Sequence, residues 1–352
     1  MKYSGIGGQA VIEGIMMMNG NDYAIAVRKP DGDIEVKKDT YVSIARKHKF
    51  LGLPFIRGIF SFIDSMVVGM RALTWSCSFF EDDEEAQPSR FEAWLDKVFG
   101  EKLESVLMSV VMVFSFVMAI GIFMVLPLLI ARFCKSFIPS ETVMAILEGV
   151  IRIVIFIGYI KLVSRMEDIK RTFMYHGSEH KCINCIEHGL ELTVDNVRAS
   201  SKEHKRCGTS FIMIVMVISI LFFMVIRVDT IWLRIVSRIV LIPGTAGVSY
   251  ECMRFAGRHD SKLVNILSRP GMWMQGLTTT EPDDSMIEVA IAAVETVFDW
   301  RSYLDEAFPG WKENSAPRQD DGTGRAYDKK ERKGAAGHDH AAAAMAWNGE
   351  TE

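Results

Sequence analysis

The sequence lacks several features that would place it in a familiar class. Its 352 residues carry a formal net charge of only −4, and no basic stripe is interleaved with aromatic residues, which argues against a nucleic-acid surface. Six cysteines are too few and too scattered for a secreted disulfide framework. The first residues have no charged start followed by an apolar core and a cleavage site, so we expect no signal peptide.

Two common catalytic patterns are also missing. The glycine-containing segment 7–14 (GGQAVIEG) is not followed by Lys-Ser or Lys-Thr and contains no G-x-G-x-x-G, which argues against a nucleotide-binding loop. No nucleophile-elbow motif supports Ser-His-Asp catalysis.

Long apolar runs are present instead, between about residues 105 and 250. A membrane-spanning helix needs roughly 20 mostly apolar residues. We expect four spans, at Ser105–Ala131, Val143–Val163, Ser210–Ile226 and Ile231–Tyr250. The last contains two arginines and Pro243, so a re-entrant or interfacial segment is its alternative.

Some of the expected spans contain charged residues. Glu148 and Arg152 are four residues apart and can meet on one helix face. That face should point into the helix bundle, because charges at membrane depth normally face protein or water. Arg234 and Arg238 can extend toward the interface from a helix end.

Basic residues are concentrated in segment 164–209 and before the first span, whereas segments 132–142 and 227–230 carry few. The positive-inside rule therefore places both termini and segment 164–209 in the cytoplasm. The expected location is the plasma membrane, with the lipid bilayer as partner and oligomerisation left open. A reducing compartment favours free thiols or metal-bound cysteines over disulfides.

The sequence outside the spans also has recognisable patterns. Residues 9–18 and 23–28 are β-capable, and Pro30-Asp31-Gly32 is a turn signal before the strand-like residues 34–37. Residues 53–76 are apolar but interrupted by charges, which suits an amphipathic helix on the membrane surface or against the bundle. Residues 286–308 predict one amphipathic helix.

These patterns predict a mainly α, polytopic helical membrane protein with a small N-terminal β unit and a disordered C-terminal tail. The expected segments are the β unit (1–52), an amphipathic helix and acidic linker (53–104), a membrane domain with a His/Cys loop at 164–209 (105–250), a cytoplasmic helical segment (251–308) and a low-complexity tail (309–352).

The sharpest chemical signal is His176-Gly-Ser-Glu179-His180. Two histidines four apart on a helix can reach one ion, with Glu179 beside them as a base. The H-x-x-E-H order also occurs in inverted zinc peptidases. A polar interfacial stretch whose histidines bond to neighbours is the alternative. His204 and Cys207 lie downstream and could complete a set of three ligands.

Other residues admit more than one interpretation. Cys182-x-x-Cys185 could be half of a zinc site or a redox pair, but it has no second C-x-x-C and no thioredoxin-like context. Glu13 could be a buried acid or an outer-shell ligand. Gln275, in the segment 270–282, is expected to have a structural role under the loop.

The chain resembles the YqhQ-like bacterial membrane proteins, a family of unknown function described as predicted metal-dependent enzymes. The resemblance rests on residues 7–16 (GGQAVIEGIM), 54–58 (PFIRG), 175–181 (YHGSEHK), 183–185 (INC), 192–197 (LTVDNV), 204–211 (HKRCGTSF) and 270–275 (PGMWMQ). It implies a multi-span membrane protein with a metal site. The residues at the polar positions of these motifs are His176, Glu179, His180, Asn184, Cys185, His204 and Cys207. Cys182 departs from the family pattern, which weakens the C-x-x-C interpretation.

Our leading hypothesis is a cytoplasm-facing metal site with His176, His180 and His204 as ligands. Cys207 would be a fourth or alternative ligand, and Glu179 an acid/base group. Zinc is favoured for mixed imidazole and thiolate ligands, and hydrolysis is the most economical chemistry. One alternative is a non-catalytic scaffold or regulator. A transporter is the other, motivated by the charges in the spans.

Overall fold

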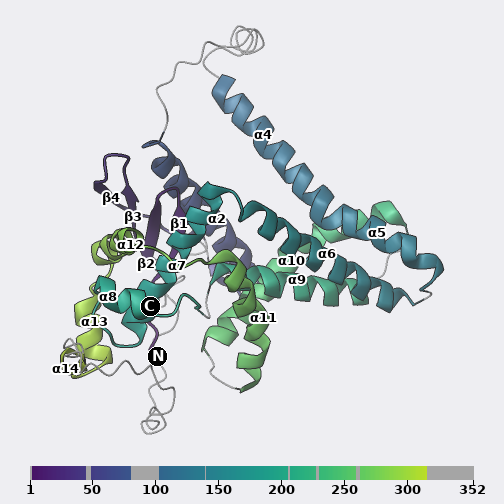
Figure 1. Ribbon diagram of the computed structural model, residues 1–352. Coiled ribbons are helices and arrows are strands. Elements are labelled where there is room, and N and C mark those ends of the chain that lie inside the picture. The colour runs from purple at the N-terminus through teal and green to yellow at the C-terminus, as the bar shows by residue number, and fades with distance from the viewer. Residues whose placement is uncertain are drawn as a thin grey trace.

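A computed structural model describes residues 2–44, 49–80, 103–138, 140–204, 207–226, 230–258 and 262–314. This part of the chain is mainly helical and contains one four-stranded sheet (Figure 1). The sheet lies at one side with α2 (Ile56–Cys77), α7 (Glu167–Glu187) and α12 (Asp284–Val297) around it. The apolar helices extend away on the other side.

The sheet is an antiparallel meander in the order β1-β2-β3-β4. Its strands are β1 (Gly7–Val11), β2 (Gly14–Asn19), β3 (Asp22–Arg28) and β4 (Ile34–Thr40). The expected turn at 30–33 joins β3 to β4, where Arg28 pairs with Ile34. β4 is largely exposed and charged, which discourages further strand pairing at this edge.

Both faces of the sheet are covered, and alternate residues serve each face. Ile15 and Met17 of β2 join a core with α7 and α12, whereas Met16 and Met18 join a second core with Val68 of α2. The sheet is therefore the middle layer between α2 and the pair α7 and α12.

The β-capable run at 9–18 is two strands rather than one. The chain turns at Ile12-Glu13, and Glu13 takes a φ of 48°. Gly14 follows, where a Cβ would overlap the carbonyl oxygen of Ala26 on β3. The prediction of one strand was wrong because a glutamate in a left-handed turn leaves no turn signal in the sequence.

The polar segment 164–209 is not an open loop. Residues 167–187 form α7, and its second half is buried throughout. A short helix, α8 (Val194–Ala199), follows. The polar side chains of α7 thus lie in the interior, where each needs a partner.

Three helical segments are long and apolar enough to cross a membrane: Val110–Ser136, Glu141–Val163 and Gly208–Val225. The first consists of the part of α4 (Leu103–Ile120) from Val110 onward, a π-helical turn η3 (Gly121–Val125), α5 (Leu126–Phe133) and the short turn η4 (Cys134–Ser136). The other two are α6 and α9. The expected fourth span is part of a helix, α10 (Ile231–Arg258), which is not among these three.

The C-terminal third of the described chain is helical, but its helices begin and end at other residues than the sequence predicted. Residues 262–278 form α11, which contains the Pro270–Gln275 motif. The amphipathic helix expected at 286–308 is two helices, α12 and α13 (Trp300–Ala307), because Asp299 caps a new start. Helix α14 (Trp311–Asn314) follows, with Trp311 buried, so any tail begins later than residue 309. Residues 315–352 and the acidic linker 81–88 lie outside the described residues.

Helix α2 buries a carboxylate on its inner face and exposes large apolar side chains on its outer face. Its buried face carries Asp64, which accepts hydrogen bonds from the hydroxyls of Tyr41 and Ser43. Its outer face exposes large apolar side chains, among them Met66 at 57% and Met70 at 50%. Such a face suits contact with lipid acyl chains rather than water.

We therefore expect Met66 to lie at the bilayer. A fluorophore on Met66→Cys, in a background that lacks the accessible cysteines Cys77, Cys134 and Cys252 and is reconstituted in vesicles, should be quenched by brominated lipid and protected from iodide. The same label on Lys37→Cys of β4 is the control, and it should respond to iodide only. Iodide quenching at both positions would contradict lipid contact.

Candidate functional site

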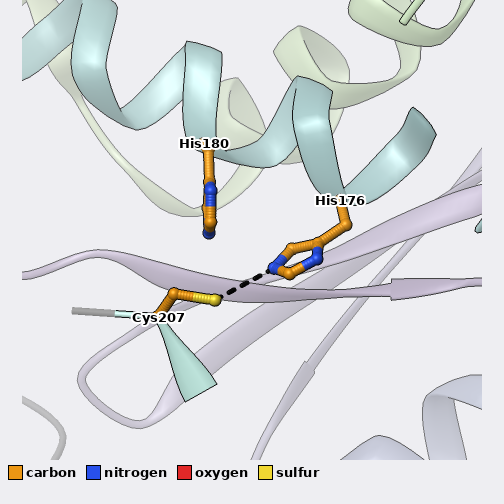
Figure 2. Close-up of side chains that lie close together, drawn as sticks. All are labelled: His176, His180 and Cys207. Carbon is orange, nitrogen blue, oxygen red and sulfur yellow. Dashed lines mark hydrogen bonds between the residues drawn. The ribbon is translucent and has the colours of Figure 1, made fainter. Parts of the chain in front are cut away.

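Three residues that can bind a metal converge beside α7. His176 and His180 lie one helical turn apart and project toward Cys207, which precedes α9 (Figure 2). One ligand atom from each residue lies within 4.8 Å of the others. His176 Nε2 is 3.1 Å from Cys207 Sγ, and the two imidazole centroids are 4.5 Å apart.

Both histidines are oriented by backbone carbonyl groups. Nδ1 of His176 lies 3.0 Å from the carbonyl oxygen of Thr278, and Nδ1 of His180 lies 2.7 Å from that of Lys202. A carbonyl oxygen can only accept, so each Nδ1 carries the proton. The unprotonated Nε2 atoms then remain for a metal, which is the usual arrangement for histidine ligands.

Cys207 is held at the start of a candidate spanning helix. It is the N-cap residue of α9 (Gly208–Val225), and its sulfur accepts from the backbone N–H of Thr209 at 3.4 Å. The Thr209 hydroxyl lies 2.8 Å from the same sulfur. The start of α9 therefore fixes the position of the Cys207 sulfur.

Burial also affects the ionisation of the cluster. His180 is 1% exposed, and desolvation lowers the pKa of its imidazole, although the neighbouring Cys207 acts in the opposite direction. The neutral imidazole, which is the form that binds metals, is therefore favoured.

The chain that leads to Cys207 is held by polar side chains of α7. Lys181 Nζ donates to the carbonyl oxygens of Arg198 and Ser200, each at 2.9 Å. Asn184 Nδ2 donates to Ser201 and Glu203 at 2.7 and 2.9 Å. These bonds fix residues 198–203 along the same helix that carries the two histidines.

Gln275 of α11 holds the other end of this segment. Its side-chain oxygen accepts from the His204 backbone N–H at 2.9 Å, and its Nε2 donates to the His204 carbonyl oxygen and the Ser210 hydroxyl. The amide is fully buried. The structure therefore places Gln275 under the loop, as expected from the sequence.

His204 is close to the cluster but its ring points elsewhere. Its imidazole Nε2 lies 3.4 Å from a carboxylate oxygen of the buried Glu187, which also accepts bonds from Ser4. His204 is not in the group of three convergent residues. Among the expected ligands, the structure thus brings together His176, His180 and Cys207.

Glu179 lies on the same face of α7 and is 5% exposed. Desolvation raises the pKa of its carboxyl group, against the opposing effects of His176 and a hydrogen bond from the Gly8 backbone N–H. A Cβ on Gly8 would lie 3.1 Å from the Glu179 carboxyl carbon. Gly8 of the 7–14 motif therefore lets β1 approach this acid closely.

The two cysteines of α7 lie apart from the group formed by His176, His180 and Cys207. Both Cys182 and Cys185 are fully buried free thiols. Desolvation holds the pKa of Cys182 well above its usual range and raises that of Cys185 to about 12. Cys185 Sγ donates to the Glu191 carbonyl oxygen at 3.3 Å. Both thiols are packed as core groups.

Glu13 supports α7 from the β1–β2 turn. Its carboxylate forms a bidentate ion pair with Arg171, and it accepts from the Tyr175 hydroxyl at 3.4 Å. The sequence alone did not predict the partner of Glu13, since Arg171 is 158 residues away. The pair anchors the N-terminal hairpin one turn before His176.

Fold and cluster together define a mainly helical protein with candidate membrane spans and a His/His/Cys group, in which His180 and Cys207 are buried and His176 is half-buried, at the end of one of them. The chain belongs to the family described as "Protein of unknown function (DUF1385)", which matches residues 53–300. It is 33% identical over 296 residues to "Uncharacterized protein YqhQ" of Bacillus subtilis (strain 168), covering 81% of this chain and 89% of the relative. No solved structure matches significantly. Neither description names an activity or a metal.

Proposed function

We propose that this chain is a plasma-membrane metalloprotein in which His176, His180 and Cys207 bind one divalent ion, with zinc favoured. The observation that carries the proposal is the orientation of the two imidazoles. Each presents Nε2 to the Cys207 sulfur while its Nδ1 donates to a carbonyl oxygen. Positive-inside topology puts this site on the cytoplasmic side.

The spacing fits a tetrahedral ion. Typical Zn–N and Zn–S bond lengths put a nitrogen and a sulfur ligand about 3.5–3.6 Å apart. The three ligand atoms here lie within 4.8 Å of one another, so a bound ion would draw them closer together. The observed 3.1 Å between His176 Nε2 and Cys207 Sγ needs only a small adjustment. Buried nitrogen and sulfur donors in a reducing compartment favour zinc over calcium or magnesium.

Three protein ligands leave a fourth position open, which is typical of catalytic rather than structural zinc sites. A bound divalent ion supplies Lewis-acid polarisation of a carbonyl or phosphoryl oxygen. Glu179, on the same helix face, is our candidate acid/base group for a hydrolytic reaction.

A structural role for the same metal is the second candidate. It is favoured by the burial of His180 and Cys207, at 1% and 6% exposed, and by the bond between Glu179 and the Gly8 backbone. In this case the ion would fasten α7 to the start of α9 in a scaffold or regulator.

Cobalt substitution tests the ligand set. Apoprotein in detergent, reconstituted with Co²⁺, should show a tetrahedral d–d spectrum together with a thiolate-to-cobalt charge-transfer band. Cys207→Ser should lose that band, whereas Cys185→Ser should keep it because Cys185 lies outside the convergent group. A charge-transfer band that survives Cys207→Ser would refute this ligand assignment.

Glu179→Gln separates the two candidate roles. Glutamine can still accept the Gly8 N–H, so the fold and the metal content should be retained. A catalytic Glu179 predicts that a deletion strain is no longer complemented, with activity lower by about 100-fold or more. Full complementation by Glu179→Gln would favour the structural metal instead.

A further inference from the structure

A second cluster of charged residues lies inside the helix bundle. Glu148 and Arg152 of α6 (Glu141–Val163) and Arg238 of α10 are each less than a tenth exposed. One carboxylate oxygen of Glu148 accepts from Arg152 at 3.0 Å, and the other accepts from Arg238. Glu148 is thus shared between the two guanidinium groups.

Arg152 has further partners from two other elements. Its Nε donates to the carbonyl oxygen of Phe123 at 3.0 Å, within the π-helical turn η3. Its Nη1 donates to the Ser219 hydroxyl of α9 at 3.1 Å. A π-helical turn interrupts regular helical bonding and often occurs at functional sites.

This cluster lies within the helix bundle, with Arg152 at the middle of α6. Arg152 is eleven residues from either end of α6, and Ser219 is eleven residues from the start of α9. At 1.5 Å per residue, both lie about 16 Å from a helix end, half of a hydrocarbon core about 30 Å thick. Arg152 and Ser219 therefore lie at a similar depth in two antiparallel helices. Ser219 is six residues, about 9 Å, from the end of α9, and Arg238 is seven residues, about 10 Å, from the start of α10, so the cluster lies inside the bundle toward the α9–α10 connection.

The positive charges in the cluster outnumber the negative charges. Two guanidinium groups face one carboxylate, and both guanidinium groups also lie near the ring of Phe223, at 5.1 and 4.8 Å from its centroid. Nη1 of Arg238 is buried and has no hydrogen-bond partner among the described residues. A net positive charge and a donor without a partner are both costly in this buried position.

We propose that Glu148, Arg152 and Arg238 form a binding site for a small monovalent anion, of the halide or nitrate class, inside the membrane bundle. The anion accepts from Arg238 Nη1 and neutralises the charge left over by Glu148. One monovalent anion would therefore accept from the free donor of Arg238 and also cancel the net positive charge of the cluster. A divalent anion would leave the cluster with a net negative charge. This site is separate from the His/His/Cys cluster and does not depend on the proposed metal.

Anion-dependent thermal unfolding tests the site. Detergent-purified full-length protein is titrated from potassium gluconate into potassium chloride, bromide or nitrate at constant ionic strength. The unfolding midpoint should rise and saturate, because a ligand that binds only the folded state stabilises it. Glu148→Gln removes a negative charge next to the anion, so it should lower the half-saturating anion concentration at least about tenfold. Arg238→Gln removes a positive charge, so it should raise that concentration by a similar factor.

Arg234→Gln is the matched control. Arg234 lies one turn earlier on α10 and is paired with Glu141 at 3.6 Å, away from the cluster. The Arg234→Gln variant should leave the half-saturating anion concentration unchanged. If Arg238→Gln fails to fold, Arg238→Lys replaces it, because lysine keeps the charge but loses the second donor group. A wild-type midpoint that is the same in gluconate and in all three anions would overturn the proposal, as would an anion response that Glu148→Gln leaves unaltered.

Discussion

Replacing His176 by alanine is expected to lower the affinity for zinc by more than about 100-fold. Loss of a partner that only orients a ligand typically costs 10- to 100-fold in affinity, and loss of a ligand should cost more. The measurement is competition between the purified protein and a zinc-binding dye.

His188→Ala is the matched control. His188 ends the same helix, and its Nδ1 lies 2.7 Å from the Asn184 carbonyl oxygen, outside the convergent group. It should retain wild-type affinity. Equal affinities for the two variants would show that His176 is not a ligand.

Gly177→Ala should disturb the site without changing any candidate ligand. A Cβ at residue 177 would overlap the backbone carbonyl oxygen of Thr280. Backbone atoms cannot move aside as a flexible side chain can, so α7 must shift away from residues 278–282. We expect a loss of about 1–3 kcal/mol in unfolding free energy. Zinc affinity should fall by about 10- to 100-fold, since Thr278 orients His176.

Gly276→Ala provides the comparison for this prediction. No atom lies within 4 Å of a Cβ added to Gly276 in α11, so alanine should be neutral or stabilise the helix by up to about 1 kcal/mol. Unfolding midpoints and zinc affinities of the two variants are measured in the same detergent. A Gly177→Ala protein as stable as Gly276→Ala would contradict the close approach of α7 to Thr280.

Much of the fold could be predicted from local patterns. Apolar runs of about 20 residues predicted α6 and α9 nearly to their ends, and the Pro-Asp-Gly turn predicted the β3–β4 hairpin. The break between α12 and α13 was missed, although Asp299 is a capping residue that could have indicated it. The turn at Glu13 had no such signal, and the partner of its carboxylate, Arg171, is 158 residues away in sequence.

The site could be predicted only in part, for a similar reason. Helical spacing placed His176 and His180 on one face, but spacing cannot choose between His204 and Cys207. That choice depends on contacts distant in sequence. Gln275 fixes the backbone of His204, while Glu187 faces its ring. The buried Asp64 of α2 was also not predicted, since sequence alone does not show which face of this helix meets the sheet.

Metal analysis of the wild-type protein tests the central claim most directly. The full-length chain, purified in detergent without chelator and then equilibrated with zinc and desalted, is analysed by mass spectrometry of its elemental content. We expect about one zinc per chain, falling to background in the His176→Ala variant. A wild-type protein that retains no metal after this treatment would contradict the metal site and both functions proposed for it.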